Sequence, residues 1–117
     1  MRYGVYVHVP WCRSRCHYCS FNVHVRQDIP WDAYVDAVLR QWEDLRPDHA
    51  PATLYLGGGT PSLMPPAHLE RLVQAVGADF TEMEANPEDL QTLSEWPIDR
   101  LSVGAQTFQA EQMAFLN

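Results

Sequence analysis

Three cysteines close to the start of the chain are the residues best suited to chemistry. Cys12, Cys16 and Cys19 are all the cysteines of the protein, and their spacing is C-x3-C-x2-C, directly after an alternating apolar run. Thiolates bind soft metals, and iron–sulfur clusters are held by cysteines on short spacings. We therefore predict a metal site with three thiolate ligands and one open position, and an iron–sulfur cluster is the preferred occupant.

Two other interpretations of these cysteines stay open on the residues alone. A structural zinc ion would need a fourth ligand nearby, which His17 or His24 could supply. The three thiols could also be reduced core residues. An odd, tightly clustered set of cysteines favours a metal or redox site over a disulfide framework in a reducing compartment.

Composition and charge restrict the class of protein. The 117 residues, 46% of them hydrophobic and 11% aromatic, suffice for one small packed domain. The formal net charge of -7 argues against binding to nucleic acid or to an anionic membrane surface. The sequence contains neither the apolar core of a signal peptide nor an apolar span of about 20 residues, so we expect a cytoplasmic protein.

Strands and helices must position the cysteines. Alternating apolar residues predict strands, and apolar residues at three- and four-residue spacings predict helices. The expected strands are Tyr3–Val9, Thr53–Leu56, Phe80–Glu84 and Leu101–Val103. The expected helices run from Pro30 to Pro47, around Leu69–Val76 up to Gly77, over Pro87–Glu95 with Asn86 as the N-cap, and from Ala110 onward. Strands that alternate with helices indicate βαβ units, so we predict an α/β fold with a parallel sheet.

Polar or glycine-rich segments follow each expected strand. The cysteine loop follows the first strand and G-G-G-T-P the second, Glu84 and Asn86 close the third, and Ser102, Gly104 and Gln106 lie at or past the fourth. Ligands of parallel sheets bind where the carboxyl ends of the strands meet, so we expect these segments to converge. On these residues alone, the glycine segment could be a helix-capping turn or an anion site at a helix N-terminus, and Glu84 and Gln106 could satisfy loop backbone.

Successive blocks of the sequence resemble one family. The cysteine motif, with Tyr18 before its last cysteine, resembles the cluster motif of the radical S-adenosylmethionine (SAM) superfamily. The further blocks are Y-V-H-V-P-W-C, C-H-Y-C-S-F-N, L-G-G-G-T-P-S, E-A-N-P and R-L-S-V-G-A-Q-T-F. Together, in this order, they resemble the oxygen-independent coproporphyrinogen III oxidases and their heme-chaperone (HemW-like) relatives.

The resemblance implies a cofactor site. Cys12, Cys16 and Cys19 match the ligands of three irons in a 4Fe-4S cluster whose fourth iron binds SAM, and Tyr18 matches a position near the adenine. The other positions that match SAM contacts of the family are Tyr6, Gly58, Gly59, Thr60, Glu84 and Gln106. The implied chemistry is one-electron reduction of SAM to give a 5'-deoxyadenosyl radical.

The resemblance leaves two functions and favours one. The first is radical decarboxylation of the propionate side chains of coproporphyrinogen III, and the second is binding of heme and its delivery to client proteins. The oxidase branch carries a further cysteine two residues after Cys19, where this chain has Phe21. That difference favours the heme-chaperone branch, with the oxidase and a metal-binding module without turnover as alternatives. The implied partners are SAM, heme or porphyrinogen, a heme-accepting protein and an electron donor.

The resemblance also predicts how much of the family's domain is present. The core of the family is a partial (β/α)6 barrel, of which about four βα units are recognisable in residues 1–117. We therefore expect one incomplete radical SAM core domain, without the last barrel units and without the C-terminal heme- or substrate-binding domain. The fourth strand would then form an exposed edge of the sheet.

Overall fold

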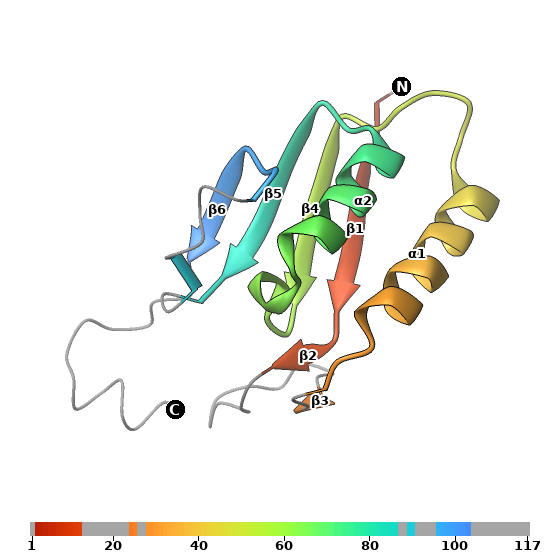
Figure 1. The fold of residues 1–117 in the computed structure, drawn as a ribbon. Helices are drawn as coiled ribbons and strands as arrows, with labels where there is room; N and C mark the ends of the chain where they lie inside the picture. The colour runs from red at the N-terminus through yellow and green to blue at the C-terminus, as the bar shows by residue number, and fades with distance from the viewer. Residues whose placement is uncertain (1, 13–23, 26–27, 87–88, 91–95, 104–117) are drawn as a thin grey trace.

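The computed structural model of the protein describes residues 2–12, 24–25, 28–86, 89–90 and 96–103. Within these residues, a parallel sheet is covered on one face by helices (Figure 1). The α/β fold expected from the sequence is confirmed.

Four parallel strands form the main sheet, in the order β1-β4-β5-β6. Their bounds are Gly4–Val9 for β1, Thr53–Gly58 for β4, Phe80–Ala85 for β5 and Arg100–Val103 for β6. A second, two-stranded parallel sheet pairs β2 (Trp11–Cys12) with β3 (His24–Val25). Because all strands of the main sheet are parallel, the segments that follow them leave from the same edge.

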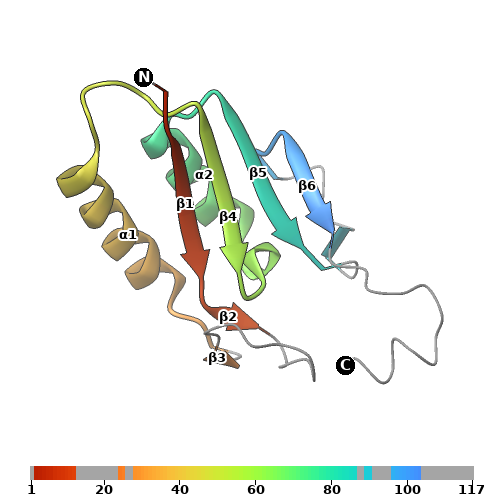
Figure 2. The same cartoon turned by 180° about the vertical axis from the view of Figure 1, so that it is seen from behind.

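Two helices cover one face of the sheet, as Figures 1 and 2 show from opposite sides. The helix α1 spans Trp31–Leu45, between Pro30 and Pro47, and α2 spans Pro66–Val76. A short 3-10 helix, η1 (Pro61–Leu63), precedes α2. Proline at the first position of α2 and Gly77 at its end, with φ of 68°, are typical start and stop signals.

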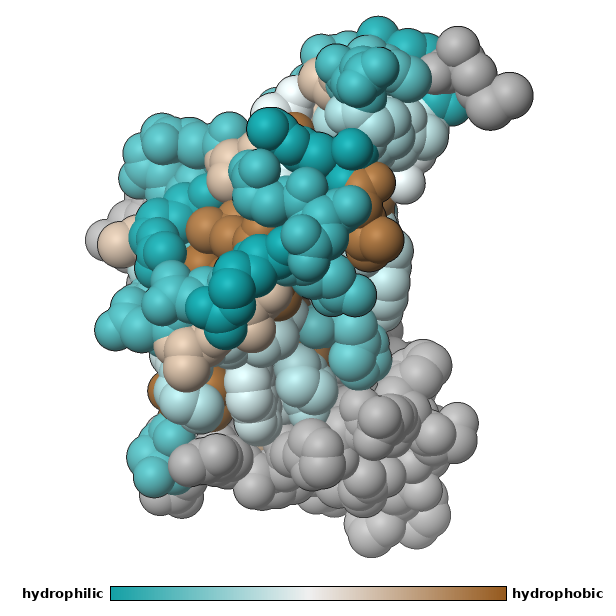
Figure 3. Space-filling model, turned by 90° about the vertical axis from the view of Figure 1, so that its right-hand side faces the viewer, coloured by the Kyte–Doolittle hydropathy of each residue, from teal (hydrophilic) through white to brown (hydrophobic). Residues whose placement is uncertain are grey.

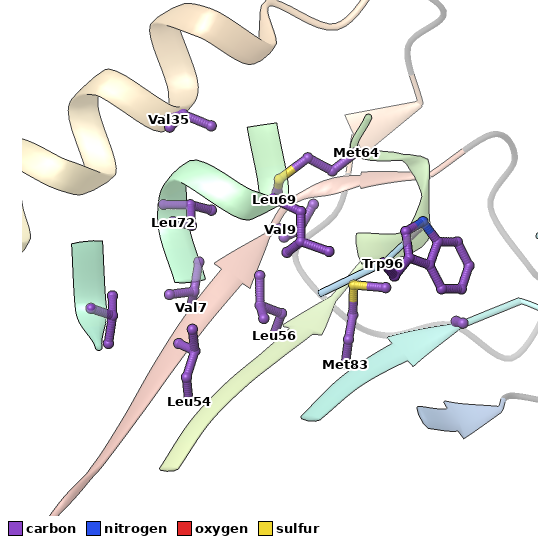
Figure 4. Packing of buried hydrophobic residues seen from close by; sticks show 12 residues of the cluster. Val7, Val9, Val35, Leu54, Leu56, Met64, Leu69, Leu72, Met83 and Trp96 are labelled. Carbon is purple, nitrogen blue, oxygen red and sulfur yellow. The ribbon is translucent and has the colours of Figure 1, made fainter. Parts of the chain in front are cut away.

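The core lies between this helical layer and the sheet (Figure 4). The alternation in β1 turns Val7 and Val9 towards the helices, and Leu54, Leu56 and Met83 from the next strands are fully buried beside them. The helices contribute Val35 from α1 and Leu69, Leu72 and Val76 from α2. Burial of each large apolar side chain contributes about 1.5–3 kcal/mol, so this interface stabilises the fold substantially.

A hydrogen bond and an ion pair bridge the two helices. His68 Nε2 lies 2.8 Å from Asp32 Oδ1, and the Arg71 guanidinium donates to Asp36 Oδ1 at 2.7 Å. The surface on the α1 side is mainly hydrophilic, with hydrophobic residues visible between the hydrophilic ones (Figure 3). Among the described residues, no helix is long and apolar enough to cross a membrane.

The opposite face of the sheet has a different character. The register places Tyr6, Tyr55, Glu82 and Arg100 side by side across β1, β4, β5 and β6. Arg100 Nη2 donates to Glu82 Oε1 at 2.7 Å, and Tyr6 is 58% exposed. No described helix covers this face of β1, β4, β5 and β6 in Figure 2. The row makes this face polar and aromatic where the other is aliphatic.

All four expected strands are confirmed, and so are the first two helices. The structure differs at β4, which continues through Gly57 and Gly58 because His8 and Val9 of β1 pair with them. It also differs at His24–Val25, where no strand was expected and where the chain forms the strand β3. Most of the third helix, Pro87–Glu95, and the segment from Ala110 onward lie outside the described residues.

Candidate functional site

The segments that follow β1 and β4 are joined by backbone hydrogen bonds. The Gly59 N–H donates to the Val9 carbonyl oxygen at 2.6 Å, and the Thr60 N–H donates to the Trp11 carbonyl oxygen at 2.7 Å. Cys12, next to Trp11, is 9% exposed. The first cysteine of the motif is thus held against the glycine segment by main-chain contacts that do not depend on side-chain type.

Two glycines make this close approach feasible. A Cβ atom at Gly59 would lie 2.5 Å from the Trp11 carbonyl oxygen and 3.0 Å from Cys12 Sγ. Gly58 has a φ of +109°, and a Cβ there would lie 2.6 Å from His8 Nδ1. Gly59 thus lets the backbone lie directly beside the thiol, and Gly58 lets it lie directly beside the end of β1.

Aromatic residues fix the start of the cysteine loop to α1. The Trp11 ring meets the Trp31 and Tyr34 rings edge-on, with centroid distances of 5.4 Å and 5.0 Å. The Tyr34 hydroxyl donates to the His8 carbonyl oxygen. Burial, with a smaller effect of Tyr6, raises the pKa of Tyr34 to about 12, so this hydroxyl stays protonated and keeps donating at neutral pH.

The carboxylate of Glu84 is oriented by the glycine segment. Its Oε1 accepts the Gly58 N–H at 2.9 Å, which joins the ends of β4 and β5. Burial raises the pKa of Tyr6 and of Tyr55, and the negative charge of Glu84 raises both further. Both phenols therefore remain neutral near the carboxylate at physiological pH.

A small aromatic platform lies beside Glu84 on the face opposite the helices. The Tyr6 ring stacks on Tyr55, with centroids 5.9 Å apart and planes 17° apart. The Tyr6 hydroxyl lies 3.2 Å from His8 Nδ1. Because Tyr6 is largely exposed, its ring can contact a planar or aromatic ligand.

Thr60 is oriented by the segment that follows β5. Its hydroxyl accepts a hydrogen bond from the Asn86 side-chain amide at 3.4 Å, and Thr60 is only 3% exposed. Ser62, two residues further on, donates to the carboxylate of Asp89. The sequence did not single out Ser62 or Asp89, although Ser62 belongs to the quoted block L-G-G-G-T-P-S.

The structure brings together six of the ten predicted site residues. Cys12, Gly58, Gly59, Thr60 and Glu84 lie at or just past the carboxyl ends of β1, β4 and β5, and Tyr6 lies in the middle of β1, with its ring close to Gly57. Cys16, Tyr18, Cys19 and Gln106 lie outside the described residues, as does His17 of the zinc alternative. Within the described ranges, which contain only the first cysteine, no three His, Cys, Asp or Glu side chains are grouped to hold a metal ion.

The described residues fit the implied cofactors. The buried Cys12 thiol is a soft donor, and Gly59 leaves the space beside its sulfur that a Cβ would fill. A cluster ligand next to half-buried glycine backbone, a carboxylate and an aromatic ring is the set of contacts that a cluster-bound SAM would need. The arrangement defines a class of protein, namely a parallel α/β protein with a cysteine loop and a glycine loop joined at the carboxyl edge of the sheet.

Comparison with known proteins identifies the family within this class. The family model described as the Radical SAM superfamily matches residues 6–117. The chain therefore belongs to the Radical SAM superfamily, as its motifs predicted.

Two groups of proteins are represented among the relatives of this chain. The heme chaperone HemW of Lactococcus lactis is 34% identical over 90% of this chain, and that of Escherichia coli is 35% identical over 94%. The oxygen-independent coproporphyrinogen III oxidase of Paracoccus denitrificans is 37% identical over 92% of the chain. The chain covers 31%, 33% and 28% of these three relatives, respectively.

A solved structure shares the fold. The structure described as "Coproporphyrinogen III oxidase (HemN) from Escherichia coli is a Radical SAM enzyme" matches 98% of this chain with a TM-score of 0.80 and 28% identity. The match covers 30% of that enzyme. The resemblance to this group of proteins predicted from the sequence is thus confirmed, and the chain spans about a third of the length of the relatives it matches.

Proposed function

We propose that this chain is the cofactor-binding part of a heme chaperone, which binds a 4Fe-4S cluster and SAM and delivers heme to a client protein. The observation that carries the cofactor proposal is the joined pair of loops, in which Gly59 lies against Cys12 Sγ. The absence of a cysteine at Phe21 supports the chaperone branch, as does the similarity to several heme chaperones.

Within this proposal, each site residue has a distinct task. Cys12, Cys16 and Cys19 hold the cluster, which when bound supplies the electron for reductive cleavage of SAM. The residues that bind and orient SAM are Tyr6, Tyr18, Gly58, Gly59, Thr60, Glu84 and Gln106. Glu84, whose Oε1 is held by the Gly58 N–H, is suited to accept hydrogen bonds from an ammonium group or a ribose hydroxyl.

The proposal also covers how much of the radical SAM core domain this chain contains. We infer that residues 1–117 form the first βα units of a radical SAM core, and that heme binding involves barrel units and a domain beyond them. A cytoplasmic location, with an electron donor and a heme-accepting protein as partners, fits this function.

Anaerobic reconstitution of the chain with iron and sulfide tests the cofactor proposal. We expect absorption and EPR spectra typical of a 4Fe-4S cluster, and a change in the EPR spectrum of the reduced cluster on addition of SAM. Cys12→Ala should lower the iron content strongly. Thr53→Ala should not, because Thr53 is at the end of β4 opposite to the glycine segment. A Cys12→Ala protein with the iron content of the wild type would contradict the proposal.

Oxygen-independent coproporphyrinogen III oxidase is the second candidate, favoured by the 37% identical relative and by the matching solved structure. The two candidates differ in what they do with a tetrapyrrole. For a protein that spans the full length of these relatives, heme titration followed by absorption spectroscopy should show binding without turnover if it is a chaperone. Conversion of coproporphyrinogen III by reconstituted protein with SAM and a reductant would instead identify the oxidase.

A further inference from the structure

A buried chain of hydrogen bonds joins the segments that follow β4 and β5. The Ser62 hydroxyl donates to Asp89 Oδ2, and the Asn86 backbone N–H donates to Ser62 Oγ at 3.4 Å. The Asp89 N–H in turn donates to the Asn86 carbonyl oxygen at 3.0 Å. Ser62 and Asp89 are 8% and 7% exposed.

This network touches residues of the proposed SAM site without belonging to it. The side chain of Asn86 donates to the Thr60 hydroxyl, and Asn86 lies two residues after Glu84. The Gly58 N–H to Glu84 hydrogen bond joins the same two segments at a second point. Two separated attachments fix both the distance and the relative orientation of the segments, whereas one would leave them free to pivot.

The chemistry of the network suits this task. A hydroxyl that donates to a carboxylate makes a charge-assisted hydrogen bond, which is stronger and more directional than a neutral one. A buried carboxylate costs free energy unless its oxygens are satisfied, so the segments around Asp89 are constrained to keep its partners in place. Small displacements of ligand-binding groups are costly, since a misplacement of about 1 Å can reduce activity by about 10²-fold.

We propose that Ser62 and Asp89 are positioning residues for SAM. They set the Thr60 segment and the Glu84 segment at the separation that SAM requires, and they act through Thr60 and Asn86 without touching the ligand. This inference rests on the proposed function, because it assigns a role relative to the SAM site.

The experiment measures SAM affinity by isothermal titration calorimetry on the anaerobically reconstituted chain, together with iron content and the melting temperature. The variants are Ser62→Ala, which removes the hydroxyl, Ser62→Thr, which restores one, and Asp89→Asn, which keeps an accepting oxygen but removes the charge. Val76→Ala serves as the control. Val76 is buried at the far end of α2, so its substitution should destabilise the fold without touching either segment.

We expect Ser62→Ala to raise the Kd for SAM about tenfold, the change that corresponds to ~1.4 kcal/mol. Iron content should stay at the wild-type level, and Ser62→Thr should restore most of the affinity for SAM. The SAM affinity of Asp89→Asn should lie between those of the wild type and Ser62→Ala. Val76→Ala should lower the melting temperature at unchanged SAM affinity. This split distinguishes positioning from a general effect on stability.

Two results would overturn the inference alone. One is wild-type SAM affinity in both Ser62→Ala and Asp89→Asn, and the other is a loss in Val76→Ala as large as in Ser62→Ala at equal melting temperature. Failure of the wild-type chain itself to take up iron or SAM would overturn the proposed function, and the inference with it. The wild-type titration therefore separates the two failures.

Discussion

Substitution of Gly59 by alanine should directly disturb the junction between the cysteine loop and the glycine segment. The added Cβ would lie 2.5 Å from the Trp11 carbonyl oxygen, 2.8 Å from its carbonyl carbon and 3.0 Å from Cys12 Sγ. Two of these three atoms are backbone, so no side-chain rotation relieves the overlap. The cysteine loop and the glycine segment must therefore move apart.

The size of the effect follows from these contacts. Overpacking in a dense region costs about 1–3 kcal/mol. Separation of the segments also weakens the hydrogen bond from the Thr60 N–H to the Trp11 carbonyl oxygen, which contributes about 1 kcal/mol. We therefore expect Gly59→Ala to lower the free energy of unfolding by about 2–4 kcal/mol, the sum of these two effects.

Urea unfolding of the reduced apoprotein, followed by circular dichroism, measures this loss. Gly77→Ala is the matched control, because its Cβ would meet no atom closer than 4.0 Å, although its φ of +68° disfavours alanine. We expect Gly77→Ala to cost about 1 kcal/mol, from backbone conformation alone.

Cluster content provides a second measurement on the same pair of variants. Gly59→Ala should also lower the iron bound after reconstitution, since it displaces Cys12, whereas Gly77→Ala should bind iron as the wild type does. Equal stability and equal iron content of Gly59→Ala and wild type would refute the reasoning, because the junction would then tolerate a side chain.

Three further predictions concern the framework around the site. Leu56→Ala should lower the free energy of unfolding by about 2–5 kcal/mol in urea titrations, because Leu56 is fully buried between the sheet and the helices; a loss below 1 kcal/mol would contradict that packing. Asp36→Asn should cost less than about 1 kcal/mol in the same assay and still less at high salt, since its partner Arg71 is also half exposed. The raised pKa of Tyr34, about 12 against an ordinary value of 10.0, means that the folded state holds this proton more tightly than the unfolded state. The stabilisation that the protonated Tyr34 hydroxyl provides is therefore complete below pH 10 and is lost as the pH rises from 10 towards 12. Tyr34→Phe should reduce the decline in the free energy of unfolding at alkaline pH, measured by urea unfolding at several pH values. An unchanged decline would contradict the raised pKa of Tyr34.

Local patterns in the sequence were enough to predict the main sheet and its helical layer. The alternation in Tyr3–Val9 identified both the strand β1 and the face that carries Val7 and Val9. Gly77 predicted the end of α2, because many helices end at a glycine in the left-handed (αL) conformation and a glycine can be recognised in the sequence. Each of these features depends on residues within a few positions of one another.

The features that the sequence did not predict depend on contacts between distant residues. Gly57 and Gly58 disfavour a strand locally, yet they continue β4 because β1 pairs with them along its whole length. The bond between Ser62 and Asp89 joins residues 27 positions apart, and neither residue type signals a partner at that separation. For the site, the converging loops were predicted from topology, whereas the close approach of Gly59 to Cys12 Sγ needed coordinates.

The division of the sheet into an aliphatic face and a polar one has a consequence for whatever covers the polar side. Tyr6, Tyr55, Glu82 and Arg100 form one row across four strands, where a second dry layer would require aliphatic side chains. Sealing an ionised carboxylate or guanidinium beneath apolar groups is costly even when the two are paired. This face of the sheet is therefore better suited to contact with water and charged small molecules than to packing beneath a second apolar layer.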